Sequence, residues 1–247
     1  MSTDRRPSPL LNTILSVPVL AAHYAFTTIM TLVIWMFAAL KRKRTVQALI
    51  RFWALTLFIL MGKRLKVIGM EHIDRNKKYV LIANHASMFD ITAILTFFPG
   101  VSWFGREHLL KIPVFGNILK MIDFIPMSPA DFSNTKRMLD QLVEKSRGRS
   151  LAMFPEGTRT LDGQINSFRR GFAHVLKSTD LDLLPVTLNG FHALRPKHRF
   201  WIDFRSKINV TVHHPIGNEH VRDRKDEEII QATRDIILSA YQLNLSS

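Results

Sequence analysis

Residues 150–159 read SLAMFPEGTR, and this stretch decides the fold class of the chain. Its first half is a short apolar run, which predicts a buried strand that leads directly into a turn. In that turn, Gly157 lets the backbone approach a ligand closely. Short apolar runs of this kind alternate with helical patterns from Gly62 onward, which is typical of an α/β domain. We therefore expect a mixed central sheet flanked by helices, preceded by an N-terminal segment of one or two helices.

The hydrophobic pattern of residues 62–247 also predicts the individual elements. Tyr79–Ala83 is apolar enough for a central strand, and residues 226–241 have the spacing of an amphipathic closing helix. Residues 87–98 predict a helix that Ser87 can cap, with Asp90 in the position of a capping-box acid. The remaining segments are strands at 64–68, 101–104, 150–154, 183–188 and one or two within 200–212, and helices at 133–145 and 172–177.

Two apolar segments precede this domain, separated by a basic cluster. Residues 7–40 include no Lys, Arg, Asp or Glu, and an uncharged apolar run of more than about 18 residues is a membrane-helix candidate. The cluster at 41–44 reads KRKR, and the second segment, 46–61, has Arg51 as its one charged residue. We therefore expect residues 1–61 to attach the chain to a membrane, and residues 62–247 to form an α/β domain.

The topology of that attachment stays open between one true span and a hairpin that enters one leaflet. Basic residues flank both ends of the first segment, which slightly favours both ends, and the α/β domain with them, on the cytoplasmic side. A cleaved signal peptide fits less well, because the apolar region is too long and no small-residue cleavage site precedes the basic cluster. A buried pair of soluble helices is the other alternative.

The charge balance indicates an anionic partner. The 34 Lys and Arg residues exceed the 20 Asp and Glu residues by 14, which suits nucleic acid, an anionic membrane surface or a phosphorylated substrate. The apolar N-terminus favours the membrane surface, so we expect no nucleic-acid partner. Cysteine is absent, which excludes disulfides, a thiol nucleophile and thiolate metal sites, and the ten histidines are too scattered to predict a metal cluster.

Two motifs carry candidate chemistry. Residues 154–159 read FPEGTR, and a chance match to six specified residues in such a chain is on the order of one in 10^5 to 10^6. Upstream, His85 and Asp90 have a His-x4-Asp spacing in which the carboxylate can orient the imidazole as a general base. That spacing alone is weak, because His198 and Asp203 share it. A predicted strand would place those two side chains on opposite faces, so we interpret the second pair as structural.

Residues 84–90 read NHASMFD, and together with the FPEGTR block they resemble, in content and order, the glycerolipid acyltransferases, whose best-known members are 1-acylglycerol-3-phosphate acyltransferases. Two further blocks are similar, REHLLKIPVFG at 106–116 and LPV at 184–186, although the family usually has a lysine at the position of Arg106. The resemblance covers residues 62–215. One block departs from it, because this chain has Met127 where the family has an arginine that helps to bind glycerol phosphate.

The resemblance implies a membrane-bound acyltransferase of phospholipid biosynthesis. Such an enzyme transfers a fatty acyl group from acyl-CoA or acyl-carrier protein, as donor substrate, to the free hydroxyl of lysophosphatidate, giving phosphatidate, and it uses no cofactor. In this interpretation His85 is the general base and Asp90 orients it. Two alternatives stay open: acyl transfer to another lyso-lipid, such as a lysophospholipid or lyso-aminolipid, and a catalytically inactive membrane scaffold of the same fold.

The same interpretation assigns substrate binding to the FPEGTR turn and to one residue of the 106–116 block. Arg159 can grip a phosphate bidentately, and Glu156 can hold Arg159, a neighbouring donor or an acceptor hydroxyl. By resemblance, Arg106 is a second contact to the phosphate or the oxyanion. The candidate substrate-binding residues are Arg106, Glu156, Gly157, Thr158 and Arg159.

The methionine at position 127 leaves two hypotheses. In the first, Lys136 or Arg137 on the next predicted helix takes over the phosphate. In the second, the acceptor is a lyso-lipid whose head group does not need that charge.

Overall fold

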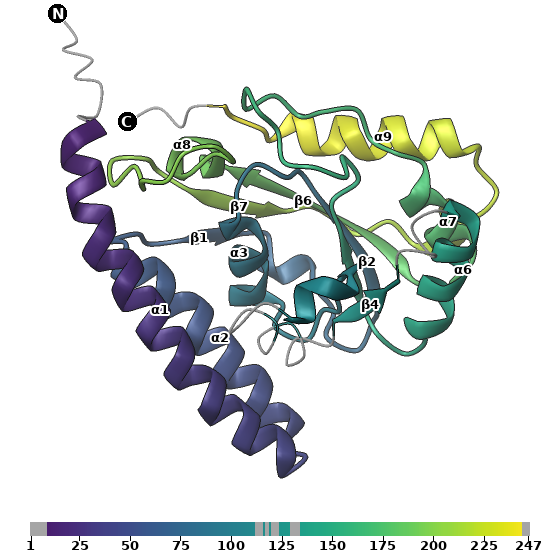
Figure 1. Ribbon diagram of the computed structural model, residues 1–247. Coiled ribbons are helices and arrows are strands. Elements are labelled where there is room, and N and C mark those ends of the chain that lie inside the picture. The colour runs from purple at the N-terminus through teal and green to yellow at the C-terminus, as the bar shows by residue number, and fades with distance from the viewer. Residues whose placement is uncertain (1–8, 112–115, 117–118, 120–123, 129–133, 244–247) are drawn as a thin grey trace, which may run out of the picture.

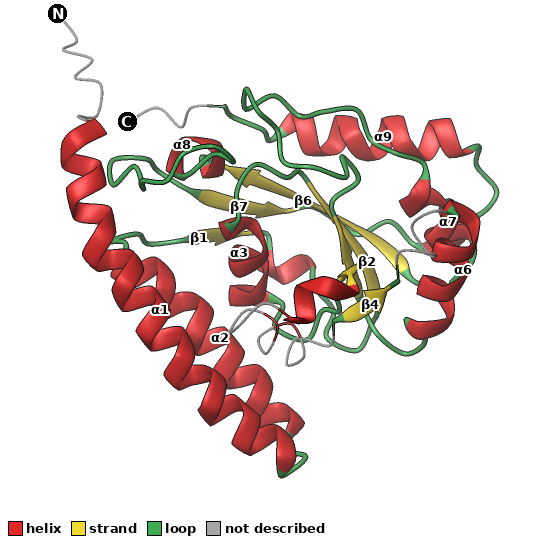
Figure 2. Cartoon of the chain, in the orientation of Figure 1, coloured by secondary structure: helices red, strands yellow, loops and turns green. Residues whose placement is uncertain are grey.

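The computed structural model describes residues 9–111, 116, 119, 124–128 and 134–243, and it has a mixed central sheet flanked by helices (Figures 1 and 2). The strands are β1 (Lys66–Ile68), β2 (Tyr79–Ala83), β5 (Leu151–Met153), β6 (Asp182–Asn189) and β7 (Asn209–Val212). They lie in the order β1-β7-β6-β2-β5. Neighbouring strands are parallel, except for the antiparallel pair β6 and β7. The fold class predicted from the sequence is confirmed.

A short parallel pair of strands, β3 (Phe104–Arg106) and β4 (Ile125–Met127), continues the sheet beyond β5. Ser102, just before β3, forms a parallel bridge to Leu151 of β5. The strand predicted at 101–104 is therefore displaced toward the C-terminus, since its regular ladder begins only at Phe104.

The central strand β2 divides the core into two layers, because alternate side chains of a strand point to opposite faces. Leu81 and Ala83 pack on the side of α3, whereas Val80 and Ile82 pack on the side of α6, α7 and α9. All of β2 is buried, as expected for a strand inside a parallel sheet. The bounds of these helices are Phe89–Phe97 for α3, Thr135–Lys145 for α6, Gly171–Lys177 for α7 and Asp226–Ser239 for α9.

The N-terminal residues form an antiparallel hairpin of two helices, α1 (Pro9–Ala39) and α2 (Lys43–Leu60), that packs on the α3 side of the sheet (Figure 1). α1 is long and apolar enough to cross a membrane. Polar contacts join the two helices: Nε2 of His23 lies 2.8 Å from the carbonyl oxygen of Leu57, and Nε1 of Trp53 donates to Oγ1 of Thr27 at 3.0 Å.

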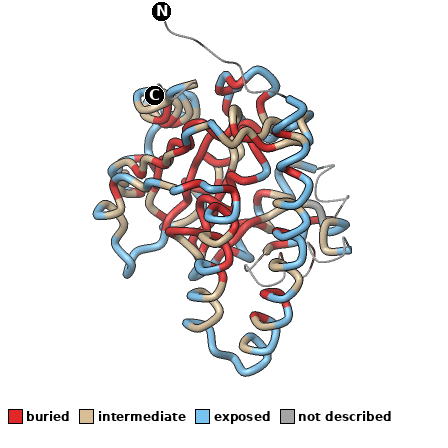
Figure 3. The backbone as a smooth tube through the Cα atoms, turned by 90° about the vertical axis from the view of Figure 1, so that its left-hand side faces the viewer, coloured by how far each residue is buried: buried red, intermediate tan, exposed pale blue. Residues whose placement is uncertain are grey.

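The polarity of α1 is reversed relative to that of a helix on a soluble domain. Several of its buried side chains are polar, and its exposed face carries large apolar side chains. Figure 3 shows that the far end of the hairpin projects beyond the sheet and is largely exposed there. The buried polar residues of α1 are Asn12, Ser16, His23 and Thr31. Its exposed large apolar residues are Leu10, Leu11, Ile14, Leu15, Val17, Tyr24, Ile29, Leu32, Trp35 and Met36.

The hydrophobic core does not divide at the predicted boundary after residue 61. Phe58 of α2 is buried in the same cluster as Ala93 of α3 and Leu188 of β6. The separation of an anchor, residues 1–61, from an α/β domain, residues 62–247, therefore stays a prediction.

The sequence predicts one or two strands within 200–212, and the strand that the alternation at 200–204 predicts is wrong. Residues 200–204 form an irregular loop, and within 200–212 only β7 forms. The backbone N–H of Ile202 donates to Oγ of Ser16 on α1 at 2.8 Å rather than to a neighbouring strand. The alternation of apolar and polar residues in this loop therefore reflects packing on the hairpin. His198 and Asp203 lie at turns of the same loop, and no ion pair joins them in the described structure.

Candidate active site

Both motifs lie at one edge of the sheet. His85 follows the carboxyl end of β2, and Glu156 follows the carboxyl end of β5. The two residues are 71 positions apart in the sequence, yet their groups are in hydrogen-bond contact. In open α/β sheets, ligands bind outside the carboxyl ends of the parallel strands. This edge is therefore the place where the fold makes a site available.

His85 and Asp90 form a hydrogen-bonded pair. Nδ1 of His85 donates to Oδ2 of Asp90 at 2.8 Å. The carboxylate is fully buried, whereas 18% of the His85 side chain is exposed. Because Nδ1 carries the proton that faces the carboxylate, Nε2 keeps its lone pair and can accept a proton from a substrate.

Asp90 also holds the turn at the start of α3. Its Oδ2 accepts the backbone N–H groups of Ala86 at 2.7 Å and Ser87 at 2.8 Å, the second of which is the contact of a capping-box acid. The hydroxyl of Ser87 accepts the N–H of Phe89, the first residue of α3, at 3.4 Å, whereas Met88 at the N-cap position makes no capping hydrogen bond with its side chain. A helix-capping role and a histidine-orienting role for Asp90 are thus compatible, because one oxygen serves both.

An aromatic stack restrains the imidazole. The ring of Phe154, the first residue of the FPEGTR turn, lies parallel to the His85 ring, with an interplanar angle of 7° and centroids 3.9 Å apart. Trp103 packs behind Phe154 at 5.3 Å. Sequence reasoning missed this contact, although an aromatic residue at a fixed place in the motif was a signal for it.

Glu156 connects the two motifs through backbone groups. Its Oε1 accepts the N–H of His85 at 2.6 Å, and its Oε2 accepts the N–H of Asn166 at 2.9 Å. Of the three contacts expected for Glu156, the one observed is therefore to neighbouring donors rather than to Arg159. The side chain is buried, and this burial raises the pKa of the Glu156 carboxyl, while the N–H groups that it accepts act in the opposite direction.

The remainder of the turn is open to solvent. Gly157 has φ of +72°, which favours glycine, and a Cβ atom there would lie 2.9 Å from Nε of Arg169. Thr158 is exposed and Arg159 is half-buried. The N–H of Thr160 donates to the carbonyl of His85 at 2.9 Å, which fixes the turn beside the histidine.

Arg195 is a component of this edge that sequence reasoning missed. It follows the short helix α8 (Phe191–Leu194), which itself follows β6. The hydroxyl of Ser87 donates to the carbonyl of Arg195 at 2.7 Å, and Nη1 of Arg195 contacts Sδ of Met88 at 2.7 Å. It lies outside the recognised motifs, so no pattern in the sequence singled it out.

Comparison with known proteins identifies the family. The family model called Acyltransferase matches residues 64–189, which are just over half of the chain and include both motifs. The chain belongs to the acyltransferase family.

The relatives of this acyltransferase include two curated enzymes with a common name. The chloroplastic 1-acyl-sn-glycerol-3-phosphate acyltransferase LPAT1 of Arabidopsis thaliana is 27% identical over 168 residues, which are 67% of this chain and 47% of that protein. The 1-acyl-sn-glycerol-3-phosphate acyltransferase of Borreliella burgdorferi is 29% identical over 187 residues, which are 74% of each chain. This chain thus spans about half the length of the plant relative.

A solved structure shares the fold. The 1-acyl-sn-glycerophosphate (LPA) acyltransferase PlsC from Thermotoga maritima has a TM-score of 0.82 and 22% sequence identity, and the match covers 93% of this chain and 95% of that one. At this identity the match shows a common architecture, including the N-terminal part of the chain.

The position that lacks the family arginine is a core position in this acyltransferase. Met127 ends β4, is fully buried and packs in the cluster beneath α6 and α7. Arg106 pairs with it in register at the end of β3, and the side chain of Arg106 lies outside the described part of the structure. Lys136 and Arg137 are exposed in the first turn of α6, where Oδ1 of Asn134 accepts the Arg137 N–H.

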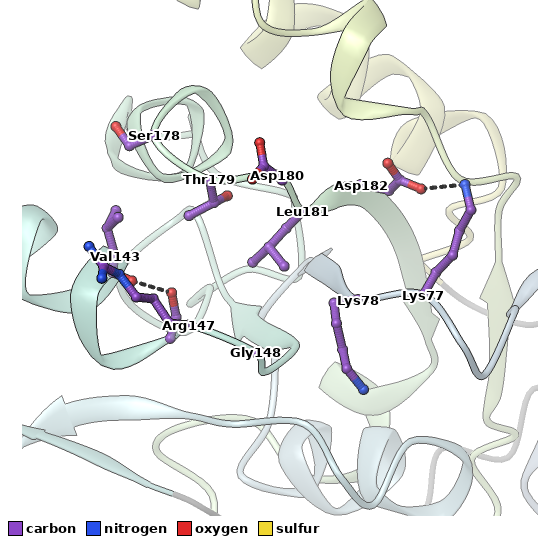
Figure 4. Close-up of a pocket in the computed structure, with 11 residues that line it drawn as sticks. Lys77, Lys78, Val143, Arg147, Gly148, Ser178, Thr179, Asp180, Leu181 and Asp182 are labelled. Atoms are coloured by element: carbon purple, nitrogen blue, oxygen red, sulfur yellow. Dashed lines mark hydrogen bonds and ion pairs between the residues drawn. The ribbon is translucent and has the colours of Figure 1, made fainter.

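A cavity of about 630 Å³ lies at the opposite, amino-terminal edge of the sheet (Figure 4). Lys77 and Asp182, which line it, form an ion pair at 2.9 Å. The motif residues are absent from its lining, so we do not assign the chemistry to it. Within the described ranges, no group of three His, Cys, Asp or Glu side chains is arranged to hold a metal ion.

Proposed function

We propose that this protein is a membrane-bound 1-acylglycerol-3-phosphate acyltransferase. It transfers a fatty acyl group from acyl-CoA or acyl-carrier protein to the free hydroxyl of lysophosphatidate and produces phosphatidate. The observation that carries the proposal is the His85–Asp90 pair held against the FPEGTR turn at the carboxyl edge of the sheet. The names of the relatives in plants and in Borreliella burgdorferi support the choice of acceptor.

In this mechanism His85 acts as the general base. Its Nε2 removes the proton of the acceptor hydroxyl as the oxygen attacks the thioester carbonyl, and the buried Asp90 carboxylate stabilises the resulting imidazolium. Collapse of the tetrahedral intermediate breaks the carbon–sulfur bond and leaves the new ester. The imidazolium returns its proton to the leaving thiolate, so CoA or the carrier protein departs as a thiol.

The other residues bind and position. Glu156 is a positioning residue, because it holds the backbone of His85 without facing the reacting atoms. Arg159 holds an anionic group of the substrate, and the exposed Gly157 and Thr158 let the substrate approach the turn closely. Arg106, at the end of the neighbouring strand β3, is the second anionic contact in this proposal.

The hairpin attaches the enzyme to the membrane. The exposed apolar face of α1 supplies the contact with lipid, and residues 62–247 carry the chemistry at the cytoplasmic face. The exposed tip of the hairpin, residues 41–44, carries four positive charges. Burying each of them in the membrane centre would cost about 2.5–3.5 kcal/mol. We therefore favour a hairpin that lies along the leaflet, with its tip at the anionic head groups, over one that enters tip-first.

A transfer assay on detergent-solubilised protein tests the proposal. Labelled acyl-CoA and then acyl-carrier protein are offered with lysophosphatidate, with other lyso-lipids and with no acceptor. His85→Ala is expected to abolish turnover of lysophosphatidate. His198→Ala is the matched control, because it removes the histidine of the second His-x4-Asp spacing, and it should retain parental activity.

The outcomes separate the hypotheses. Turnover of another lyso-lipid but not of lysophosphatidate would replace the acceptor and keep the chemistry. Activity in His85→Ala equal to that of the parent would contradict the role of His85 as general base. The absence of turnover with every acceptor would contradict the enzyme assignment and leave an inactive scaffold as the explanation.

A further inference from the structure

The loop after α8 places Arg195 against the turn between His85 and Asp90, on the side of the α1–α2 hairpin. Arg195 is fixed to this turn twice, through its carbonyl to Ser87 and through its guanidinium to Met88, and both residues lie between His85 and Asp90 in the sequence. The same loop packs on α1, where Ile202 contacts Ser16. Arg195 therefore lies between the candidate catalytic pair and the helix that faces lipid.

A second arginine approaches the same turn from the FPEGTR motif. Arg159 precedes Thr160, whose N–H is bonded to the carbonyl of His85. Burial lowers the pKa of the Arg195 guanidinium, and the positive charge of Arg159 acts in the same direction. In the described structure neither guanidinium has a carboxylate partner.

The nearby acids contact other groups. Oδ2 of Asp90 accepts from His85 and from two backbone N–H groups, while its buried Oδ1 has no hydrogen-bond partner among the described residues, and both oxygens of Glu156 accept backbone N–H groups. The contacts of Arg195 itself use Nε, to the carbonyl of Arg199 at 3.3 Å, and Nη1, to a methionine sulfur. A thioether is a weak acceptor, and a guanidinium has five donors. Most of the hydrogen-bonding capacity of Arg195 is thus left for a ligand.

Two half-buried cations without a counter-ion are unfavourable unless an anion joins them. Planar guanidinium groups match the oxygens of a phosphate, with which they form paired charge-assisted hydrogen bonds. We propose that Arg195 and Arg159 together bind a substrate phosphate beside His85, and that Arg195 supplies the charge that this chain lacks at Met127. This inference rests on the proposed function, because it assigns the phosphate to a substrate of that reaction.

The position of Arg195 favours the phosphate of the acceptor lipid. Its guanidinium lies 5.9 Å from the ring centroid of Phe200 and contacts Met88, so two exposed apolar side chains flank the arginine. A lyso-lipid whose acyl chain stays in the membrane would bring its head group past these side chains. The phosphates of the acyl donor have the same chemistry, and the test separates the two sources.

The test uses Arg195→Gln and Arg195→Lys in the full-length protein. Lys197→Gln is the matched control, because it removes one positive charge from an exposed position of the same loop. Kinetics are measured with lysophosphatidate varied, with acyl-CoA varied, and with monoacylglycerol as an acceptor that has no phosphate. Circular dichroism and thermal unfolding establish that each variant is folded, and Arg195→Lys serves if Arg195→Gln is not.

We expect Arg195→Gln to raise the KM for lysophosphatidate about tenfold or more, with the KM for acyl-CoA and the turnover of monoacylglycerol changed less than about twofold. Arg195→Lys should fall between Arg195→Gln and the parent, because it keeps the charge and loses the forked donors. A rise in the KM for acyl-CoA instead would support the two-arginine phosphate site and assign its phosphate to the donor.

Three results would overturn the inference. The first is unchanged kinetics in a folded Arg195→Gln variant, the second an equal loss in Lys197→Gln, and the third a loss for monoacylglycerol as large as that for lysophosphatidate. A rise in the KM for lysophosphatidate with Lys136→Gln/Arg137→Gln, but not with Arg195→Gln, would instead assign the binding of the phosphate to Lys136 or Arg137 of α6. In each case a parent that is active and a His85→Ala variant that is inactive would leave the proposed function intact.

Discussion

The two edges of the central sheet differ in whether their cationic side chains are paired with acids. At the amino-terminal edge, acids neutralise cations: Lys77 pairs with Asp182 at 2.9 Å, and Arg222 pairs with Asp180 at 2.6 Å. At the carboxyl edge, the carboxylates of Asp90 and Glu156 accept N–H groups of residues 85–87 and of Asn166. The arginines there have no counter-ion in the described structure. Charges that are paired serve the fold, whereas charges that are positioned and left unpaired indicate a place for a substrate.

The largest expected difference is between the loss of kcat on neutralising an acid at the carboxyl edge and that on neutralising one at the amino-terminal edge. Asp90→Asn should lower kcat about 10^3- to 10^4-fold, because an amide no longer selects the His85 tautomer or stabilises the imidazolium. Asp182→Asn should leave kcat unchanged and lower the unfolding free energy only slightly, since it weakens an ion pair whose lysine is exposed to solvent. Steady-state kinetics and urea unfolding of both variants test the contrast. An equal loss of kcat at both edges would contradict it.

The second-largest effect is expected on the unfolding free energy, at Met127, where the family has an arginine. Met127→Arg should lower the unfolding free energy by about 3 kcal/mol or more, because it buries a charge in an apolar cluster. Met127→Leu, the control, should cost less than about 1.5 kcal/mol. Urea unfolding measures both. A stable Met127→Arg variant with a lower KM for lysophosphatidate would instead mean that this position can reach the substrate.

Glu156 should show a smaller effect on rate and a distinctive pH dependence. Glu156→Gln places an amide NH2 against one of the two N–H groups, so we expect kcat to fall about tenfold. Glu144→Gln, at an exposed position of α6, should not change kcat. These rates are measured in the transfer assay with saturating substrates.

The pH dependence follows from the direction of the pKa shift. Burial raises the pKa of Glu156 in the folded protein, so the folded state retains a proton that the unfolded chain has already released. The stability contributed by this group is fully present below the ordinary carboxyl pKa and is lost as the pH rises through the raised value. The parent should therefore lose stability relative to Glu156→Gln across that window. Urea unfolding at a series of pH values would contradict this if the difference stayed constant.

The smallest effect should come from the ring stacked on His85. Phe154→Leu removes an aromatic contact worth about 0.5–1.5 kcal/mol, and we expect kcat to fall several-fold, by about that free energy. Phe168→Leu removes a similar ring contact with Phe172 on the opposite face of the sheet. It should lower the thermal unfolding temperature without changing kcat. A drop in kcat for both variants would mean that the rings act only through global stability.

Local patterns predicted the elements well where burial on both faces of the sheet dominates. Tyr79–Ala83 is a strand whose five consecutive apolar side chains are buried in the two layers of the core, alternately on one face of the sheet and the other. This strand was predicted with its observed bounds. The loop at 200–204 was predicted wrongly, because its alternation has the period of a strand while the backbone of Ile202 is bonded to α1. The period of the apolar residues indicates which side chains are buried. Here the segment that buries them is α1, nearly two hundred residues earlier in the chain.

What the sequence determined by itself was the family, through its two motifs, and the apolar N-terminus, since these depend on residue types at short spacing. The spacing of His85 and Asp90 and the composition of the FPEGTR turn were sufficient to predict the family and the candidate base. Only the tertiary structure decided that Glu156 faces backbone groups, that Met127 lies in the core and that Arg195 contacts the turn between His85 and Asp90. Those contacts join strands far apart in the chain, and parallel strands bring their carboxyl ends together only once the sheet has formed.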